Sequence, residues 1–381
     1  MPVTLVVTND FPPRQGGIET FVKQLTDRFP LGRVVVYTSA EPGGAAHDAA
    51  LPYPVVRDRA RMLLPTPRTT ARAVALAREH GCEAVWFGAA APLGLMAPRL
   101  RREAGVRRVV ATTHGHEVWW ARTPGAAALL RRIGRGADAV TYLGAATRAP
   151  LARALGSGAR LVRMVPGVDA AAFAGGVPGR IRRRLGLPAE APVVLCAARL
   201  VPRKGQDTLI RALPLVRARV PGTRLLLVGA GPDEARLRRL ADRYGVSGAV
   251  VFAGGRPHRE LPDHYAAADV FAMPCRTRRA GLELEGLGIV YLEAAAAGLP
   301  VLAGRSGGAP DTVRDGETGF VVDGRDVAAV AGRLTGLLGD RAAAAAMGAR
   351  GRERVAADWS WEGAWEVLAG LLGEGAPVGG R

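Results

Sequence analysis

Lysine is nearly absent from this chain, because only Lys23 and Lys204 are lysines among its 52 cationic side chains. Where arginine is the default cation, a lysine favours a site that needs a compact point charge, although chance can also place one there. Cysteine is scarce as well: Cys82, Cys196 and Cys275 are an odd number, without the spacing of a metal site. They predict reduced, buried thiols in a cytosolic protein rather than a disulfide framework.

Long apolar runs and an acidic metal-binding motif are also missing. No stretch of about 18 apolar residues occurs, so no membrane-spanning helix is predicted. Asn9 and Asp10 end the first apolar run and no basic segment precedes it, so the chain is expected to begin with a strand rather than a signal peptide. The sequence has no Asp-x-Asp pair for a nucleotide-bound divalent ion.

The apolar residues that are present predict two domains of the same α/β kind. The chain has 381 residues, 48% of them apolar, and short β-rich runs alternate with longer helical patterns. Such alternation predicts Rossmann-like, doubly wound parallel sheets covered on both faces. The pattern stops near Pro166 and restarts after about Gly179, which divides an N-terminal domain, 1–168, from a C-terminal domain, 169–357. We expect a deep cleft where the two domains face each other.

The end of the chain, 358–381, is rich in tryptophan. We expect a helix here that packs back on the first domain. A belt at a membrane interface is the alternative, because tryptophan is also enriched at the headgroup level.

The net charge of +18 lies mainly in the first half of the chain. Residues 1–168 carry 23 Arg and Lys against 11 Asp and Glu, a net charge of +12. Such an excess predicts an anionic partner, either an anionic membrane surface or nucleic acid. No nucleic-acid-binding motif and no basic stripe interleaved with aromatics occurs, which favours the membrane. A solvated surface in an arginine-biased chain is the remaining explanation.

Two spaced pairs of charged residues carry the strongest functional signal. Arg199 and Lys204 have the spacing R-x4-K and follow the first predicted strand of the second domain. Glu285 and Glu293 have the spacing E-x7-E, with Gly286, Leu287, Gly288 and Ile289 between them at the predicted start of a helix. Two fixed cations can hold a diphosphate, and two carboxylates can accept hydrogen bonds from sugar hydroxyls. Together they predict a site for a sugar nucleotide.

Two further motifs follow strands of the first domain. Gly16 and Gly17 follow the first strand, where glycine amides and a helix N-terminus can approach an anion, although a plain turn is the alternative. His114 and His116 follow a later strand, in Thr-His-Gly-His-Glu. With Glu117 they could be metal ligands, but a metal site needs a further well-spaced ligand, so a functional role at the cleft without a metal is the favoured interpretation.

These motifs, in this order and over essentially the whole chain, resemble the retaining glycosyltransferases of family four, which have the GT-B fold. The stretch from Met273 to Glu293, with the stretch from Thr8 to Glu19, is similar to the actinobacterial α-mannosyltransferases of the PimB type, which extend phosphatidylinositol mannosides.

The resemblance implies a role for each motif. Arg199 and Lys204 would bind the donor diphosphate, and Glu293 the ribose. The donor sugar would contact the segment from Glu285 to Ile289, the Gly16–Gly17 turn, and His114, with His116 as a less suitable substitute. The segment from Val251 to Arg256 would line the base pocket.

The resemblance also implies a GDP-mannose donor, retaining transfer without a metal or other cofactor, a glycolipid acceptor, and a position at the inner face of the plasma membrane. Three alternatives stay open. A UDP-sugar could be the donor; the chain could be a non-catalytic binder of acidic lipid or nucleic acid; or it could be a sugar-nucleotide epimerase on the same scaffold.

Overall fold

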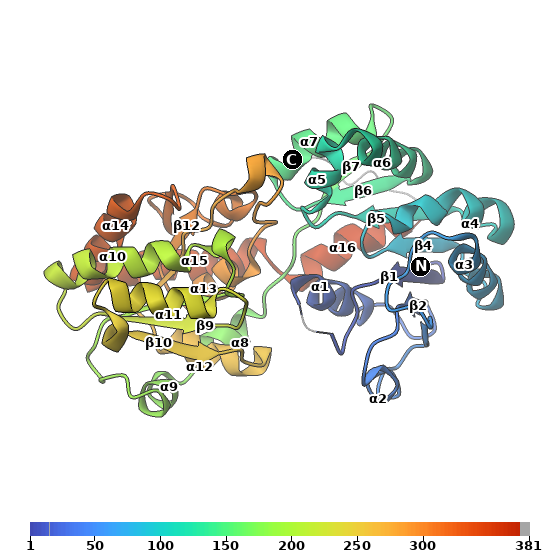
Figure 1. Ribbon diagram of the computed structural model, residues 1–381. Helices are drawn as coiled ribbons and strands as arrows, with labels where there is room; N and C mark the ends of the chain where they lie inside the picture. Colours follow the sequence, from blue (N-terminus) through green and yellow to red (C-terminus); the bar gives the residue numbers. More distant parts are fainter. Residues whose placement is uncertain (15, 374–381) are drawn as a thin grey trace. The chain divides into compact units, whose positions relative to one another are not determined.

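The chain forms two compact units in the computed structural model, which describes residues 1–14 and 16–373. The first unit comprises Met1–Gly167 and the chain from Trp361 onward, and the second comprises Val168–Ser360 (Figure 1). Each unit is built on one parallel sheet, so the predicted α/β fold with two Rossmann-like domains is confirmed.

The first unit contains a seven-stranded sheet in the order β3-β2-β1-β4-β5-β6-β7. Its strands are apolar nearly throughout, as expected for a sheet with both faces covered. The strand order reverses between β1 and β4: β2 and β3 lie on one side of β1, and β4 to β7 lie on the other. The strands are β1 (Thr4–Thr8), β2 (Val34–Thr38), β3 (Val55–Arg57), β4 (Ala84–Phe87), β5 (Arg108–Thr112), β6 (Ala139–Tyr142) and β7 (Leu161–Arg163).

Helices cover this sheet on both faces. On one face Leu76 of α3, Leu100 of α4, Ile133 of α6 and Leu151 of α7 belong to a single buried core with alternate strand residues. On the other, α16 contacts α1, β4 and β5 (Figure 1). The helices of this unit are α1 (Gly17–Thr26), α2 (Gly44–Asp48), α3 (Pro67–Glu79), α4 (Ala97–Ala104), α5 (Glu117–Arg122), α6 (Pro124–Gly136), α7 (Ala145–Leu155) and α16 (Trp361–Leu372).

The C-terminal helix α16 is held by aromatic contacts as well as by its apolar face. Trp361 lies against Phe21 of α1 with ring centroids 6.0 Å apart, and Trp365 lies 4.8 Å from Phe29. Leu368 is fully buried. The last part of the predicted segment, 374–381, lies outside the described residues.

The second unit contains a six-stranded parallel sheet in the order β10-β9-β8-β11-β12-β13. The strand order reverses between β8 and β11, which are hydrogen-bonded neighbours. In such sheets ligands bind beyond the carboxyl ends of the strands at this reversal. The strands are β8 (Val193–Ala197), β9 (Arg224–Val228), β10 (Val250–Gly254), β11 (Val270–Met273), β12 (Val301–Gly304) and β13 (Gly319–Val322).

This reversal determines which face of the sheet each helix covers. Right-handed crossover connections to the two sides of the reversal pass over opposite faces of the sheet. Thus α10 packs with α11 and α14, whereas α13 packs with α8 and α15. The helices are α8 (Ala170–Ala174), α9 (Pro178–Arg184), α10 (Gln206–Arg219), α11 (Glu234–Arg243), α12 (Leu261–Ala266), α13 (Ile289–Ala296), α14 (Val327–Gly339) and α15 (Arg341–Asp358).

The structure differs from the sequence expectations in a few local features. The short edge strand β3 was not expected, and the supposed linker after Pro166 contains α8 and α9. Asp169 caps α8 by accepting a hydrogen bond of 2.9 Å from the backbone N–H of Ala172. The three cysteines are free and buried, as predicted. Among the described residues, no helix has the length and apolar character that a membrane crossing requires.

Replacing Leu368 by alanine should destabilise the protein by about 2–5 kcal/mol, because a fully buried leucine leaves a cavity when it is truncated. Chemical denaturation followed by circular dichroism measures this loss. The matched control is Leu31→Ala, since Leu31 is 81% exposed. Equal midpoints for the two variants would contradict the packing of α16 described above.

Candidate active site

A buried ion pair joins the two loops that leave the central strands of the second unit. Lys204, in the loop after β8, places its Nζ 2.7 Å from Oε2 of Glu285, in the loop after β11. Arg203 places its Nη1 2.9 Å from the same oxygen. The side chains of Lys204 and Glu285 are 11% and 8% exposed. The structure thus brings together one residue from each of the two predicted charge motifs.

The electrostatics keep Glu285 ionised. Burial by itself would raise the pKa of this carboxyl, but Lys204 and Arg203 outweigh burial and hold the pKa below its ordinary value. The backbone N–H of Glu285 also donates to Oγ of Ser306, at 3.2 Å. The carboxylate is therefore a fixed acceptor of hydrogen bonds and not a proton donor at neutral pH.

Arg199 lies differently from the other cation of its motif. Its side chain is exposed, and it forms no ion pair with any residue in the described part of the chain. The sequence assigned equal roles to Arg199 and Lys204, and it missed Arg203 between them. A guanidinium without a protein counter-ion at the end of β8 remains available to an external anion.

Two glycines allow the loops to approach each other this closely. Gly205 has a left-handed φ of 80°, and a side chain there would collide with the carbonyl of Pro274 after β11. Gly288, directly before α13, has a φ of 85°, and an added Cβ would lie 2.6 Å from the ring of Tyr291. Gly286, Leu287 and Ile289 therefore continue from Glu285 into the helix by way of a glycine turn, as the sequence predicted.

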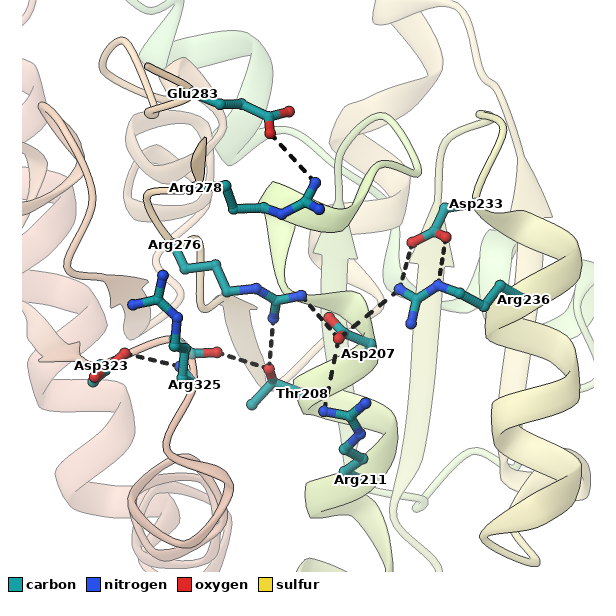
Figure 2. A network of polar contacts seen from close by, with 11 residues as sticks. Asp207, Thr208, Arg211, Asp233, Arg236, Arg276, Arg278, Glu283, Asp323 and Arg325 are labelled. Carbon is teal, nitrogen blue, oxygen red and sulfur yellow. Dashed lines mark hydrogen bonds and ion pairs between the residues drawn. The ribbon is translucent and has the colours of Figure 1, made fainter. Parts of the chain in front are cut away.

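A wider polar network around Asp207 connects these loops to neighbouring segments (Figure 2). Asp207, in the first turn of α10, is buried and accepts a hydrogen bond of 2.8 Å from Arg276 of the loop after β11. Arg276 also donates to Oγ1 of Thr208 at 3.0 Å, and that hydroxyl donates to the carbonyl of Gly324 after β13. Arg236 of α11 lies 3.9 Å from Asp207. The Asp207 carboxylate and the Thr208 hydroxyl together thus tie segments that follow four strands.

Glu293, the second carboxylate of the E-x7-E motif, is held by two side chains that the sequence did not suggest. It is 2% exposed. Its Oε1 lies 2.9 Å from Nε2 of His258, and its Oε2 accepts a hydrogen bond of 2.8 Å from the hydroxyl of Tyr265. The hydrogen bond to Glu293 raises the pKa of His258. Glu285 precedes α13, whereas Glu293 lies within it.

Arg256 follows β10 and is half-buried. Its Nε is buried and makes no hydrogen bond with the described residues. The predicted base-pocket segment from Val251 to Arg256 therefore ends on a guanidinium with an unused donor, two positions before His258 in the sequence.

His114 of the first unit lies at the carboxyl end of β5. Its Nε2 lies 2.6 Å from the carbonyl oxygen of Gly88, which follows β4. Because a carbonyl only accepts, Nε2 carries the proton. Burial lowers the pKa of His114, so the ring is neutral and Nδ1 is an acceptor.

The helix that begins at Gly17 contacts this histidine. Gly17 begins α1, and the ring of Phe21 in the next turn lies edge-on to His114 with centroids 5.3 Å apart. Gly16 has an extended backbone, and a Cβ there would collide with the carboxylate of Glu19. Helix α1 and the loop after β5 are therefore in contact through Phe21 and His114.

Glu117 organises the turn that carries both histidines. Its Oε2 accepts hydrogen bonds from the backbone N–H groups of His114, at 2.9 Å, and Gly115, at 3.1 Å. Its Oε1 lies 3.3 Å from Nε2 of His116, whose side chain is 47% exposed. The described residues contain no group of three His, Cys, Asp or Glu side chains that could hold a metal ion.

Solved structures share this two-domain fold. The crystal structure of Anabaena Alr3699/HepE in complex with UDP is 21% identical and aligns with a TM-score of 0.81 over 97% of this chain and 98% of that one. The crystal structure of WaaG, a glycosyltransferase of lipopolysaccharide biosynthesis, is 20% identical, with a TM-score of 0.70 over 98% of this chain and all of that one.

Sequence comparison identifies the family. Residues 15–172 match the model of Glycosyltransferase Family 4, and residues 179–354 match that of Glycosyl transferases group 1. The chain belongs to this family of glycosyltransferases, as its motifs predicted.

Curated relatives match nearly the whole chain. The GDP-mannose-dependent alpha-(1-6)-phosphatidylinositol monomannoside mannosyltransferase of Mycolicibacterium smegmatis is 52% identical over 97% of both chains. A GDP-mannose-dependent enzyme of Corynebacterium glutamicum, named for the monoacylated monomannoside, is 47% identical over 97% of both chains.

The pKa of His258 provides a direct test of its contact with Glu293. We expect its imidazole to titrate above the ordinary value of 6.5, because the carboxylate favours the charged ring. The charged pair is therefore complete below pH 6.5 and is lost as the pH rises through the raised pKa. Glu293→Gln should lower the titration midpoint, since it removes the largest cause of the raised pKa.

Histidine side-chain NMR measures this titration, and the His258→Gln variant assigns the resonance. An unshifted midpoint for His258 in the unmodified protein would show that the contact does not exist in solution.

Proposed function

We propose that this protein is a GDP-mannose-dependent α-mannosyltransferase that transfers mannose, with retention of configuration and without a metal ion, to a phosphatidylinositol mannoside. The observation that carries the proposal is the 52% identity, over 97% of both chains, to a mannosyltransferase with that donor and class of acceptor. The paired loops at the end of β8 and β11 support it, because they supply the charges that such a donor needs.

On the donor side, we assign the diphosphate to Lys204 and the exposed Arg199. As the glycosidic bond breaks, negative charge grows on the diphosphate, and cations that are already fixed stabilise that charge more than they stabilise the ground state. Lys204 has its Nζ on Glu285, which leaves further N–H donors for a phosphate oxygen. The turn from Gly286 to Ile289 adds backbone amides at the start of α13.

We assign the transferred sugar to Glu285 and His114, and the ribose to Glu293. The ionised carboxylate of Glu285 can accept hydrogen bonds from sugar hydroxyls, and the free Nδ1 of a neutral His114 can accept another. Gly16 and Gly17 would contribute backbone contacts to the phosphates or the sugar, and Arg256 would lie at the base. In retaining transfer without a protein nucleophile, the acceptor hydroxyl attacks from the face that the diphosphate leaves.

We place the enzyme at the cytoplasmic face of the plasma membrane, as a peripheral protein. The acceptor named for the relatives is a membrane glycolipid. The net charge of +12 in residues 1–168 fits an anionic membrane surface, to which each nearby arginine contributes about 1 kcal/mol of attraction.

Replacing Lys204 by alanine should lower kcat/KM for mannose transfer by about 100- to 1000-fold, because the diphosphate loses a preorganised cation. The chain offers a matched control in its only other lysine: Lys23 of α1 pairs with Asp27 at the surface, and Lys23→Ala should retain full activity. Steady-state kinetics together with circular dichroism would separate this effect from unfolding. Full activity in Lys204→Ala would overturn the assignment.

A donor panel tests the proposed substrates. With radiolabelled GDP-mannose and membranes that contain phosphatidylinositol mannosides, we expect a labelled mannolipid whose formation persists in excess EDTA. UDP-glucose and UDP-N-acetylglucosamine should give no product. Preferred use of a UDP-sugar, or loss of turnover on chelation that Mg²⁺ restores, would contradict the donor or the metal-free mechanism respectively.

A further inference from the structure

We infer that His258 is a positioning residue that, with Tyr265, holds the Glu293 carboxylate toward the ribose diol and so sets the preference for a ribonucleotide donor over its 2′-deoxy analogue. The inference deepens the donor site and rests on the proposed function, in which Glu293 binds the ribose. Neither His258 nor Tyr265 belongs to the R-x4-K or the E-x7-E motif.

The hydrogen bonds of Glu293 are arranged so that each carboxylate oxygen has one protein partner. His258 occupies Oε1 at 2.9 Å and Tyr265 occupies Oε2 at 2.8 Å. A carboxylate oxygen has two lone pairs, so each retains one for a further donor. Two neighbouring hydroxyls, as in a ribose 2′,3′-diol, match these two remaining lone pairs, whereas a 2′-deoxyribose leaves one of them without a donor.

The two hydrogen-bond partners of Glu293 differ in solvent exposure. Tyr265 is fully buried in α12, while the side chain of His258 is 60% exposed although it contacts a carboxylate that is 3% exposed. His258 therefore lies at the boundary between the buried acid and the solvent, which is the side from which a ligand would reach that acid. A histidine needed only for packing would be buried with its partner.

Phe173 of α8 gives both partners their orientation. Its ring lies edge-on to His258, with centroids 5.6 Å apart, and edge-on to Tyr265, at 5.3 Å. The imidazole is thus held between an aromatic edge and a carboxylate, and a rotation of His258 away from Glu293 would lose both contacts. This arrangement restricts the Glu293 carboxylate from the exposed side, where it would otherwise be free to rotate.

Equilibrium binding of GDP and 2′-deoxy-GDP, measured by isothermal titration calorimetry at constant pH and salt, tests the inference. The unmodified protein should prefer GDP. His258→Ala should weaken GDP binding by about tenfold, as for a lost hydrogen bond to a charged group, and change 2′-deoxy-GDP binding by no more than about twofold. His258→Gln, which retains an N–H donor, should recover part of the preference.

Three matched variants make the result interpretable. Glu293→Gln should abolish the preference, and combining it with His258→Ala should add nothing further, because both act on one contact. Lys204→Ala should weaken both nucleotides equally. Arg259→Ala removes the exposed neighbour of His258 in the same short helical turn and should leave the preference unchanged.

Failure of the inference and failure of the proposed function give different results. If the unmodified protein binds neither nucleotide, or binds both equally, the assignment of Glu293 to a ribose is wrong. If Glu293→Gln abolishes the preference but His258→Ala preserves it, or weakens both nucleotides alike, only the role of His258 is wrong.

Discussion

The interaction on which the rest of the site depends is the contact of Lys204 and Arg203 with the buried carboxylate of Glu285. The two loops come from β8 and β11, the neighbouring strands between which the sheet order reverses. A buried carboxylate without a cation would be strongly unfavourable, and two cations without an acid would repel each other. Each loop therefore stabilises the other, and together they leave a charged, preorganised surface at the end of the sheet.

This contact needs a rigid support, which the Asp207 network supplies. Asp207 follows Lys204 by three residues and accepts a hydrogen bond from Arg276, while the backbone N–H of Arg276 donates to the carbonyl of Arg203 at 2.9 Å. The loop that leads to Glu285 is thus attached to the Lys204 loop at two points. A site that stabilises developing charge gains from such support, because its groups need not reorganise during the reaction.

The fold could be predicted from the sequence because its signals are local and repeated. Apolar runs such as Val193–Ala197 and Val270–Met273 coincide with strands in the structure, since strands buried on both faces leave a continuous apolar pattern. The edge strand Val55–Arg57 has only three residues and is half-buried, so its pattern was too weak to be recognised. Helices α8 and α9 were missed because their segment is rich in glycine, alanine and proline, the composition expected of a linker.

The sequence predicted the positions of the site residues along the chain, but not the contacts between their side chains. R-x4-K and E-x7-E place their residues at strand ends, but spacing does not say which side chains meet. Arg203 and not Arg199 shares Glu285 with Lys204, because the short helical turn at Pro202–Lys204 directs it there. His258 reaches Glu293 across 35 positions of sequence, from the short helical turn that precedes α12. Such pairings depend on tertiary structure, and a single sequence without aligned relatives carries no local signal for them.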